Sequence, residues 1–178
     1  MHEQAKLRTT CFMVKGAGKF EMAAIISYLS MAAGTAGLFL GFYHMEHRPA
    51  LSLKIITMTT VGVTGVFAFV RHFFFHQADA RRLGWETVRP EWAFEVGFAN
   101  LAFGLVGWLA VICSYSTQTQ AVLVLGYALY LFQAGLLHGH TYFTDGKKSA
   151  ARLWRSCLAT LLYAGMMSFF AIKTLCIQ

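Results

Sequence analysis

Five apolar segments, each close to the length that a helix needs to cross a bilayer, constrain this chain more than any other feature. About 30 Å of hydrocarbon takes roughly 20 helical residues to cross. The segments are Phe20–Phe42, Leu51–Phe74, Trp92–Cys113, Val122–Leu137 and Trp154–Ile172. Only 13% of the residues are charged, whereas soluble domains carry roughly a quarter. We therefore expect an all-α, polytopic membrane bundle of about five transmembrane helices.

The ends of the chain fit the same interpretation. Residues 1–19 are polar and basic, and we expect them to form a cytoplasmic leader at the membrane interface. Residues 20–178 then form a single transmembrane domain. Its first apolar stretch exceeds the roughly 7–15 residues of a signal-peptide core, so we do not expect cleavage. Both prolines, Pro49 and Pro90, fall between proposed spans.

The basic residues predict an orientation. Alternating loops divide the 15 Lys and Arg residues unequally: four in the leader, four in the loop after the second span and four in the loop after the fourth, which makes 12 on one side. Short loops rich in Lys and Arg stay cytoplasmic. The N-terminus is therefore expected inside and the C-terminus outside, in the cytoplasmic (inner) membrane. The net charge of +7 then indicates contact with lipid headgroups and not with nucleic acid.

Small residues recur at spacings of three and four along three of the proposed helices. Such faces let helix backbones approach closely in lipid, and one amide among them can hydrogen-bond to a neighbour. Their number favours self-association or assembly with other membrane subunits. The predicted packing residues are Ser30, Gly34, Gly37, Gly41, Gly62, Gly65, Gly97, Asn100, Gly104 and Gly107.

A second set of polar residues is expected at the cytoplasmic ends of the second, third and fourth helices. They are His72, His76, Glu91, Glu95, His138 and His140, with Gly139 as the predicted helix stop. Imidazole with carboxylate suits Zn or non-haem Fe, and two facing histidines suit a haem. The same residues can instead form a structural hydrogen-bond layer, handle protons or hold an anionic headgroup. Glu95 can alternatively neutralise Arg71, Arg82 or Arg89.

The cysteines leave two alternatives open. Cys113 and Cys176 both fall near the outer ends of their helices, where a disulfide between them is possible. The alternative, which we favour, is that the cysteines are buried or interfacial thiols. No close pair has the spacing of a metal site.

Several motifs in residues 72–142 occur together. They are His76, Leu83-Gly84-Trp85, the stretch from Phe94 to Leu101 with Gly104 and Gly107, and Gly139-His140. In this pattern the chain resembles an uncharacterised prokaryotic family of small membrane proteins. The resemblance implies an integral membrane protein of unknown function. It singles out His76, Glu95, Asn100 and His140 for mutation.

Three classes of function remain open, since no phosphate-binding loop, nucleophile elbow or zinc-protease motif occurs. The first, which we favour, is a non-catalytic membrane subunit that associates with itself or with other subunits. The second is a small transporter or channel with a polar path at Glu95, Asn100, Gln133 and His140. The third is a haem- or metal-binding redox protein that uses His72, His76, Glu95, His138 and His140. No cofactor is predicted for the first class.

Overall fold

The computed structural model describes residues 2–83, 90–144 and 149–176, with side chains for 18–81, 90–144, 149–150 and 152–176. Within these residues the chain is helical and contains no strand. The elements in order are α1 (His2–His44), α2 (Pro49–Ile56), η1 (Thr57–Val63), α3 (Thr64–Phe74), α4 (His76–Leu83), α5 (Glu91–Ile112), α6 (Thr117–Thr144), α7 (Ala150–Leu153), η2 (Trp154–Leu158) and α8 (Ala159–Cys176). The segments η1 and η2 are π-helical.

Five segments are long and apolar enough to cross a membrane, which confirms the predicted all-α class of a polytopic bundle. They are Gly18–His44, Pro49–Phe74, Glu91–Ile112, Thr117–Thr144 and Trp154–Cys176. We number them spans 1 to 5. Span 4 is longer than predicted at both ends. At its C-terminal end the hydroxyls of Thr141 and Thr144 donate to carbonyls one turn earlier, so these polar residues continue the helix.

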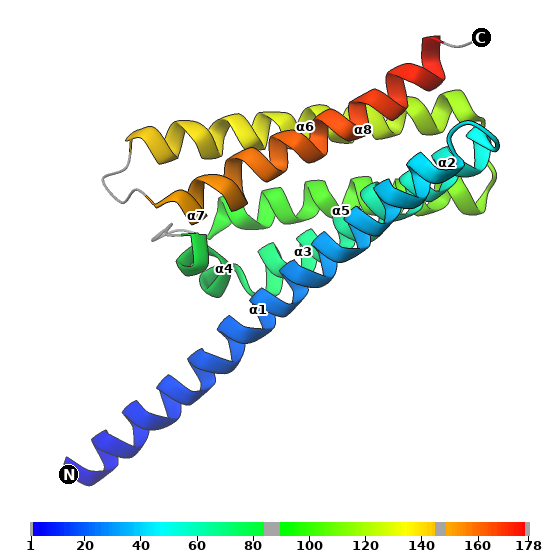
Figure 1. Ribbon diagram of the computed structural model, residues 1–178. Coiled ribbons are helices and arrows are strands. Elements are labelled where there is room, and N and C mark those ends of the chain that lie inside the picture. Colours follow the sequence, from blue (N-terminus) through cyan, green and yellow to red (C-terminus); the bar gives the residue numbers. More distant parts are fainter. Residues whose placement is uncertain (1, 84–89, 145–148, 177–178) are drawn as a thin grey trace.

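Helix α1 continues without a break through the segment predicted as a leader. Its helical backbone begins at His2, and the N-terminal part projects away from the other helices (Figure 1). The remainder, from Gly18, packs against α2, η1, α3 and α4. Residues 2–17 therefore extend span 1 along its own axis.

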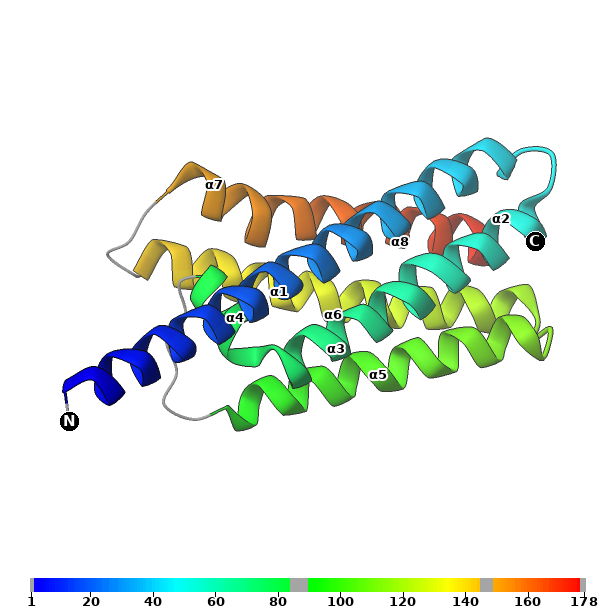
Figure 2. The same ribbon diagram turned by 90° about the horizontal axis from the view of Figure 1, so that it is seen from below.

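Span 2 is the centre of the bundle. Its elements contact all four other spans, and α3 lies between α1 and α5 (Figure 2). In the most apolar stretch of span 2, 44% of the residues are buried, against 22–28% in the corresponding stretches of the other spans. Lipid contact therefore falls mainly on the other four helices.

The central span widens into a π-helix where threonines are concentrated. Thr59 Oγ1 donates to the Ile55 carbonyl at 2.7 Å and Thr60 Oγ1 to the Ile56 carbonyl at 2.6 Å. Thr64 makes the same kind of bond to the Thr60 carbonyl. Side-chain bonds of this kind compete with the backbone ladder and bend helices. They also satisfy hydroxyl groups that lipid cannot solvate.

Two pairs of neighbouring spans pack closely in the bundle. In the α3–α5 pair, a Cβ added at Gly65 would lie 2.7 Å from the Asn100 carbonyl and 2.9 Å from the Gly104 Cα. Where α6 packs against η2 of span 5, a Cβ at Gly139 would lie 3.1 Å from Cys157 Sγ. The prediction that Gly139 stops its helix is thus wrong. The residue lies inside α6, where the absence of a side chain lets η2 approach.

The two ends of the bundle differ. At one, which we call the α4 end, lie α4, the start of α5 and the end of α6. At the other, the C-terminal end, lie the α1–α2 and α5–α6 connections and the end of α8 (Figure 1). The α5–α6 connection turns at Ser114, which takes a left-handed conformation with φ of 52°. The segment after span 2, interpreted from sequence as a loop, contains the helix α4.

Candidate functional site

A hydrogen-bonded group of polar side chains lies in the bundle interior and is centred on Asn100 of α5. The Asn100 Nδ2 group donates to the Val96 carbonyl at 2.7 Å and to Tyr130 Oη at 3.0 Å. Its Oδ1 accepts a bond from Tyr127 Oη at 2.8 Å. Asn100 and Tyr127 are both buried. The bonds join α5 to α6 and use both donors of the amide.

The same group extends into spans 2 and 5. The Tyr127 hydroxyl also interacts with the side chain of Thr64, and Tyr163 interacts with those of Thr60 and Thr64. Tyr163 Oη lies 3.5 Å from the Thr60 carbonyl, to which it donates. We call Thr60, Thr64, Asn100, Tyr127, Tyr130 and Tyr163 the tyrosine network. It connects four spans in an interior where unpaired polar groups are costly.

A charged cluster lies at the α4 end. Arg71 Nε of α3 is 3.1 Å from the Asp79 carboxylate of α4, and His72 Nδ1 is 3.5 Å from the same oxygen. Arg71 also donates to Ser27 Oγ of α1 at 3.4 Å. The Asp79 side chain is only 2% exposed. The cluster therefore ties α4 to spans 1 and 2 and neutralises a buried carboxylate.

The structure brings together only part of the predicted His and Glu layer. His72 faces Asp79, and His138 lies close to Arg71 and Asp79. His76 instead contacts the Phe73 carbonyl at 3.1 Å and the ring of Phe94. The remaining members, Glu91, Glu95 and His140, lie on the exposed surface.

Two consequences follow for that layer. Among the residues with described side chains, no group of three or more His, Cys, Asp or Glu residues is arranged to hold a metal ion. Arg71, one of the predicted partners of Glu95, pairs with Asp79. The other two, Arg82 and Arg89, lie outside the described side chains.

The residues predicted as a transport path occupy different environments. Asn100 is buried in the tyrosine network, whereas Glu95, Gln133 and His140 are exposed on the outside of the bundle. Within the described part of the chain, the Gln133 amide has no hydrogen-bond partner. These four side chains therefore do not line one interior path.

Most of the predicted packing glycines contact neighbouring helices within the bundle. Gly34 faces Tyr163, Gly37 faces Thr59, Gly41 faces Ile56 and Phe170, and Gly62 faces Trp108. Gly65, Gly97, Gly104 and Gly107 contribute to the pairing of spans 2 and 3. Ser30 is half-buried. These glycines serve internal packing, and their number therefore gives no independent argument for association with a second copy.

Sequence reasoning missed Asp79 and Tyr127. Asp79 is one of two acidic residues in an otherwise basic connection between spans 2 and 3. A carboxylate in such a basic segment could have indicated an ion pair. Tyr127 lies one turn before Tyr130 on an apolar helix, and nothing in the local pattern shows which face points inward. Gly84 and Trp85 of the motif Leu83-Gly84-Trp85 fall outside the described residues.

The open question about the cysteines is answered by the geometry. Cys113 and Cys176 are both free and exposed. Cys157 is free and buried, against Gly139. The structure thus agrees with the alternative of separate thiols for the first two.

A helical bundle with five apolar spans, a central polar network and no strand in its described residues is the structure of a multi-pass membrane protein. Residues 20–174 match the family of unknown function DUF6790, and the chain belongs to that family. This agrees with the resemblance to an uncharacterised family. Comparison with curated proteins and with solved structures gave no match.

Proposed function

We propose that this protein is a non-catalytic membrane subunit that self-associates through the outer face of α6. The observation that carries the proposal is the exposed amide of Gln133, which lies among the exposed apolar side chains Leu129, Phe132, Leu136 and Leu137. We call these five residues the α6 face.

The depth of Gln133 in the membrane makes an amide without a hydrogen bond energetically unfavourable. At 1.5 Å per residue, Gln133 is about 14 Å along the helix from Tyr142, near the α4 end, which puts it well within a hydrocarbon layer of about 30 Å. Transfer of an amide without a hydrogen bond into a medium that cannot supply one costs about 4–8 kcal/mol. An exposed amide at this depth therefore favours a partner that can bond to it.

A second copy of the chain is the partner that fits the α6 face best. A glutamine amide contains both a donor and an acceptor, so two such groups can pair across a two-fold axis. The surrounding leucines and Phe132 supply the apolar contacts of such an interface. Hydrogen bonds of this kind between membrane helices are worth about 0.6–2 kcal/mol each.

The proposal includes an orientation. The positive charges predicted near the α4 end, including Arg71 and Arg81 of the described part, favour a cytoplasmic position for that end. The C-terminal end then faces outward from the cytoplasmic membrane. Labelling of the exposed Cys176 by an impermeant thiol reagent on intact cells tests this orientation. Labelling only after the cells are opened would contradict it.

The test of self-association uses singly labelled protein diluted into liposomes, with the dimer fraction measured by stepwise photobleaching. We expect Gln133→Leu to weaken association about tenfold, because it removes both hydrogen bonds and keeps an apolar surface. Gln133→Asn retains an amide and should keep more of the association. Leu162→Ala, on the exposed face of α8, is the matched control and should leave it unchanged.

Two results would contradict the proposal. One is a wild-type protein that remains monomeric at high protein-to-lipid ratio. The other is a Gln133→Leu variant that dimerises as strongly as the wild type.

A further inference from the structure

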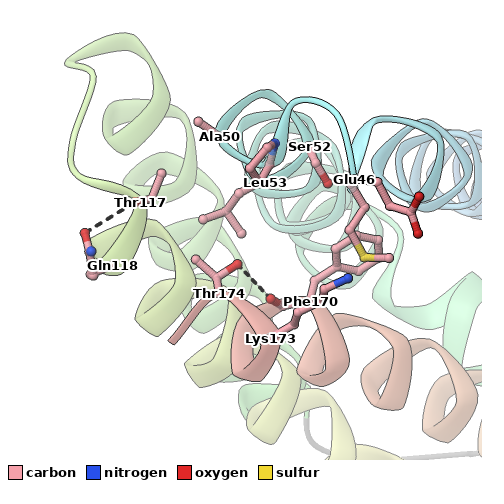
Figure 3. Close-up of a pocket in the computed structure, with 11 residues that line it drawn as sticks. Glu46, Ala50, Ser52, Leu53, Thr117, Gln118, Phe170, Lys173 and Thr174 are labelled. Carbon is pink, nitrogen blue, oxygen red and sulfur yellow. Dashed lines mark hydrogen bonds between the residues drawn. The ribbon is translucent and has the colours of Figure 1, made fainter. Parts of the chain in front are cut away.

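A pocket of about 560 Å³ lies at the C-terminal end of the bundle (Figure 3), the end opposite the α4 end with its Arg71–Asp79 cluster. The α1–α2 connection and the start of α2 form one wall. The first turn of α6 and the last turns of α8 form the others. A volume in the range of about 300–1,000 Å³ is typical of small-molecule sites.

The pocket combines an apolar surface with two opposite charges. Met45, Leu53 and Phe170 contribute the apolar part, and Glu46 and Lys173 are the charged lining residues. Figure 3 shows Lys173 beside Phe170 and Glu46 at the edge of the pocket. Among the described residues neither Glu46 nor Lys173 forms an ion pair.

The other polar groups of the pocket are largely engaged. Ser52 Oγ donates to the Gly41 carbonyl at 2.7 Å, and Thr174 Oγ1 donates to the Phe170 carbonyl at 2.9 Å. Their hydroxyl protons are therefore committed to the backbone. Glu46 and Lys173 remain as the groups that can select a ligand by charge.

We propose that this pocket binds a zwitterionic headgroup that contains an ammonium and a phosphate. The Glu46 carboxylate binds the ammonium, and the Lys173 ammonium binds the phosphate. The apolar part of the ligand lies on Met45, Pro49 and Ala50, the accessible apolar residues of the lining. A ligand with a single charge would place its charge near a group of like sign on one side of the pocket, so the pair favours a zwitterion.

The location of the pocket favours a membrane lipid as the source of this headgroup. The pocket lies at the ends of spans 1, 2, 4 and 5, the level at which headgroups meet the protein. Tyr43 and Tyr115 are exposed at the same end of the bundle, as is typical of side chains at a membrane interface. A soluble zwitterion with the same headgroup chemistry is the other source.

The experiment is native mass spectrometry of the full chain in mild detergent, titrated with dioleoyl phosphatidylethanolamine or dioleoyl phosphatidylglycerol. We expect the zwitterionic lipid to bind about tenfold more tightly than the anionic lipid. Glu46→Gln and Lys173→Gln should each reduce its binding about tenfold, since each removes one charge-assisted contact. Soluble phosphoethanolamine added as a competitor distinguishes the sources: displacement at similar concentration identifies a soluble ligand, and no displacement identifies the lipid.

A charge exchange separates recognition from folding. The double variant Glu46→Lys with Lys173→Glu keeps both signs in the pocket and should restore binding lost in the single variants Glu46→Lys and Lys173→Glu. Lys54→Gln, at the same end but outside the lining, is the matched control and should bind as the wild type. Equal binding of the two lipids, or zwitterion binding unaffected by Glu46→Gln and Lys173→Gln, would overturn the proposal.

Discussion

Asn100 and Gln133 have the same carboxamide group, at similar depth in neighbouring helices, yet they lie in opposite environments. Asn100 bonds to Tyr127 and Tyr130 of α6, whereas Gln133 lies one turn beyond Tyr130 on the exposed surface. The buried amide has all its bonds within one chain. The exposed amide has none among the described residues. The comparison separates polar groups that hold the monomer together from one that favours a second molecule.

The largest expected loss of stability is at the charged cluster, where the buried polar group is one member of an ion pair. Asp79→Asn leaves the Arg71 guanidinium without its charge partner, and breaking a buried pair costs about 3 kcal/mol. We expect a much lower midpoint of thermal unfolding in detergent, measured by tryptophan fluorescence. Glu95→Gln, at an exposed carboxylate, is the control and should change stability by less than about 0.5 kcal/mol.

The second effect tests the buried side of the comparison directly. Asn100→Leu removes the partner of two tyrosine hydroxyls and should cost about 2 kcal/mol of unfolding free energy. The dimer fraction of the protein that remains folded should not change. An unfolding midpoint equal to that of the wild type would show that the tyrosine network does not stabilise the monomer.

The third effect concerns the packing that brings the network together. Gly65→Ala places a methyl group against the backbone of α5 and should destabilise the fold by about 1–3 kcal/mol. Gly165→Ala is the matched control, because no atom lies within 4 Å of its added Cβ. We expect this second variant to be as stable as the wild type or slightly more stable, since alanine favours helix. Equal loss in the two variants would argue against close packing as the cause.

The smallest effect on stability is expected at the exposed amide. Gln133→Leu should change the unfolding free energy of the monomer by less than about 0.5 kcal/mol, since the side chain has no partner within the described chain. The measurement is thermal unfolding in detergent at a protein concentration that keeps the chain monomeric. A loss as large as that of Asn100→Leu would remove the distinction between the two amides.

The sequence predicted the spans because apolar length is a local property. Five long apolar segments sufficed to predict the membrane helices. Most of the predicted helix ends lie within a few residues of the ends in the structure. The C-terminal end of span 4 extended further because Thr141 and Thr144 bond to the helix backbone. Helix α4 was not predicted. It is held in place by the contact of its Asp79 with Arg71 of α3, and a contact between different elements cannot be recognised from the local sequence.

The inner faces of the helices were harder to predict, for a physical reason. In a membrane bundle the lipid-facing side chains are as apolar as the core, so periodicity does not show which side is inside. Leu129 is exposed and Tyr127 is buried, although both lie in the same apolar helix. Among the predicted polar residues, Asn100 proved to be interior and Gln133 exterior. Only the arrangement of neighbouring helices separates these cases.

The most direct test of self-association through α6 is photo-crosslinking in membranes. A benzophenone side chain is introduced at Leu129 or Leu136, which flank Gln133 and leave its amide intact, and in parallel at Leu162 of α8 as the control. All three side chains are exposed. Self-association through the α6 face predicts crosslinked dimers from the two α6 positions, with the link mapped to α6 of the second copy, and none from Leu162. Crosslinks from all three positions alike, or from Leu162 alone, would contradict it.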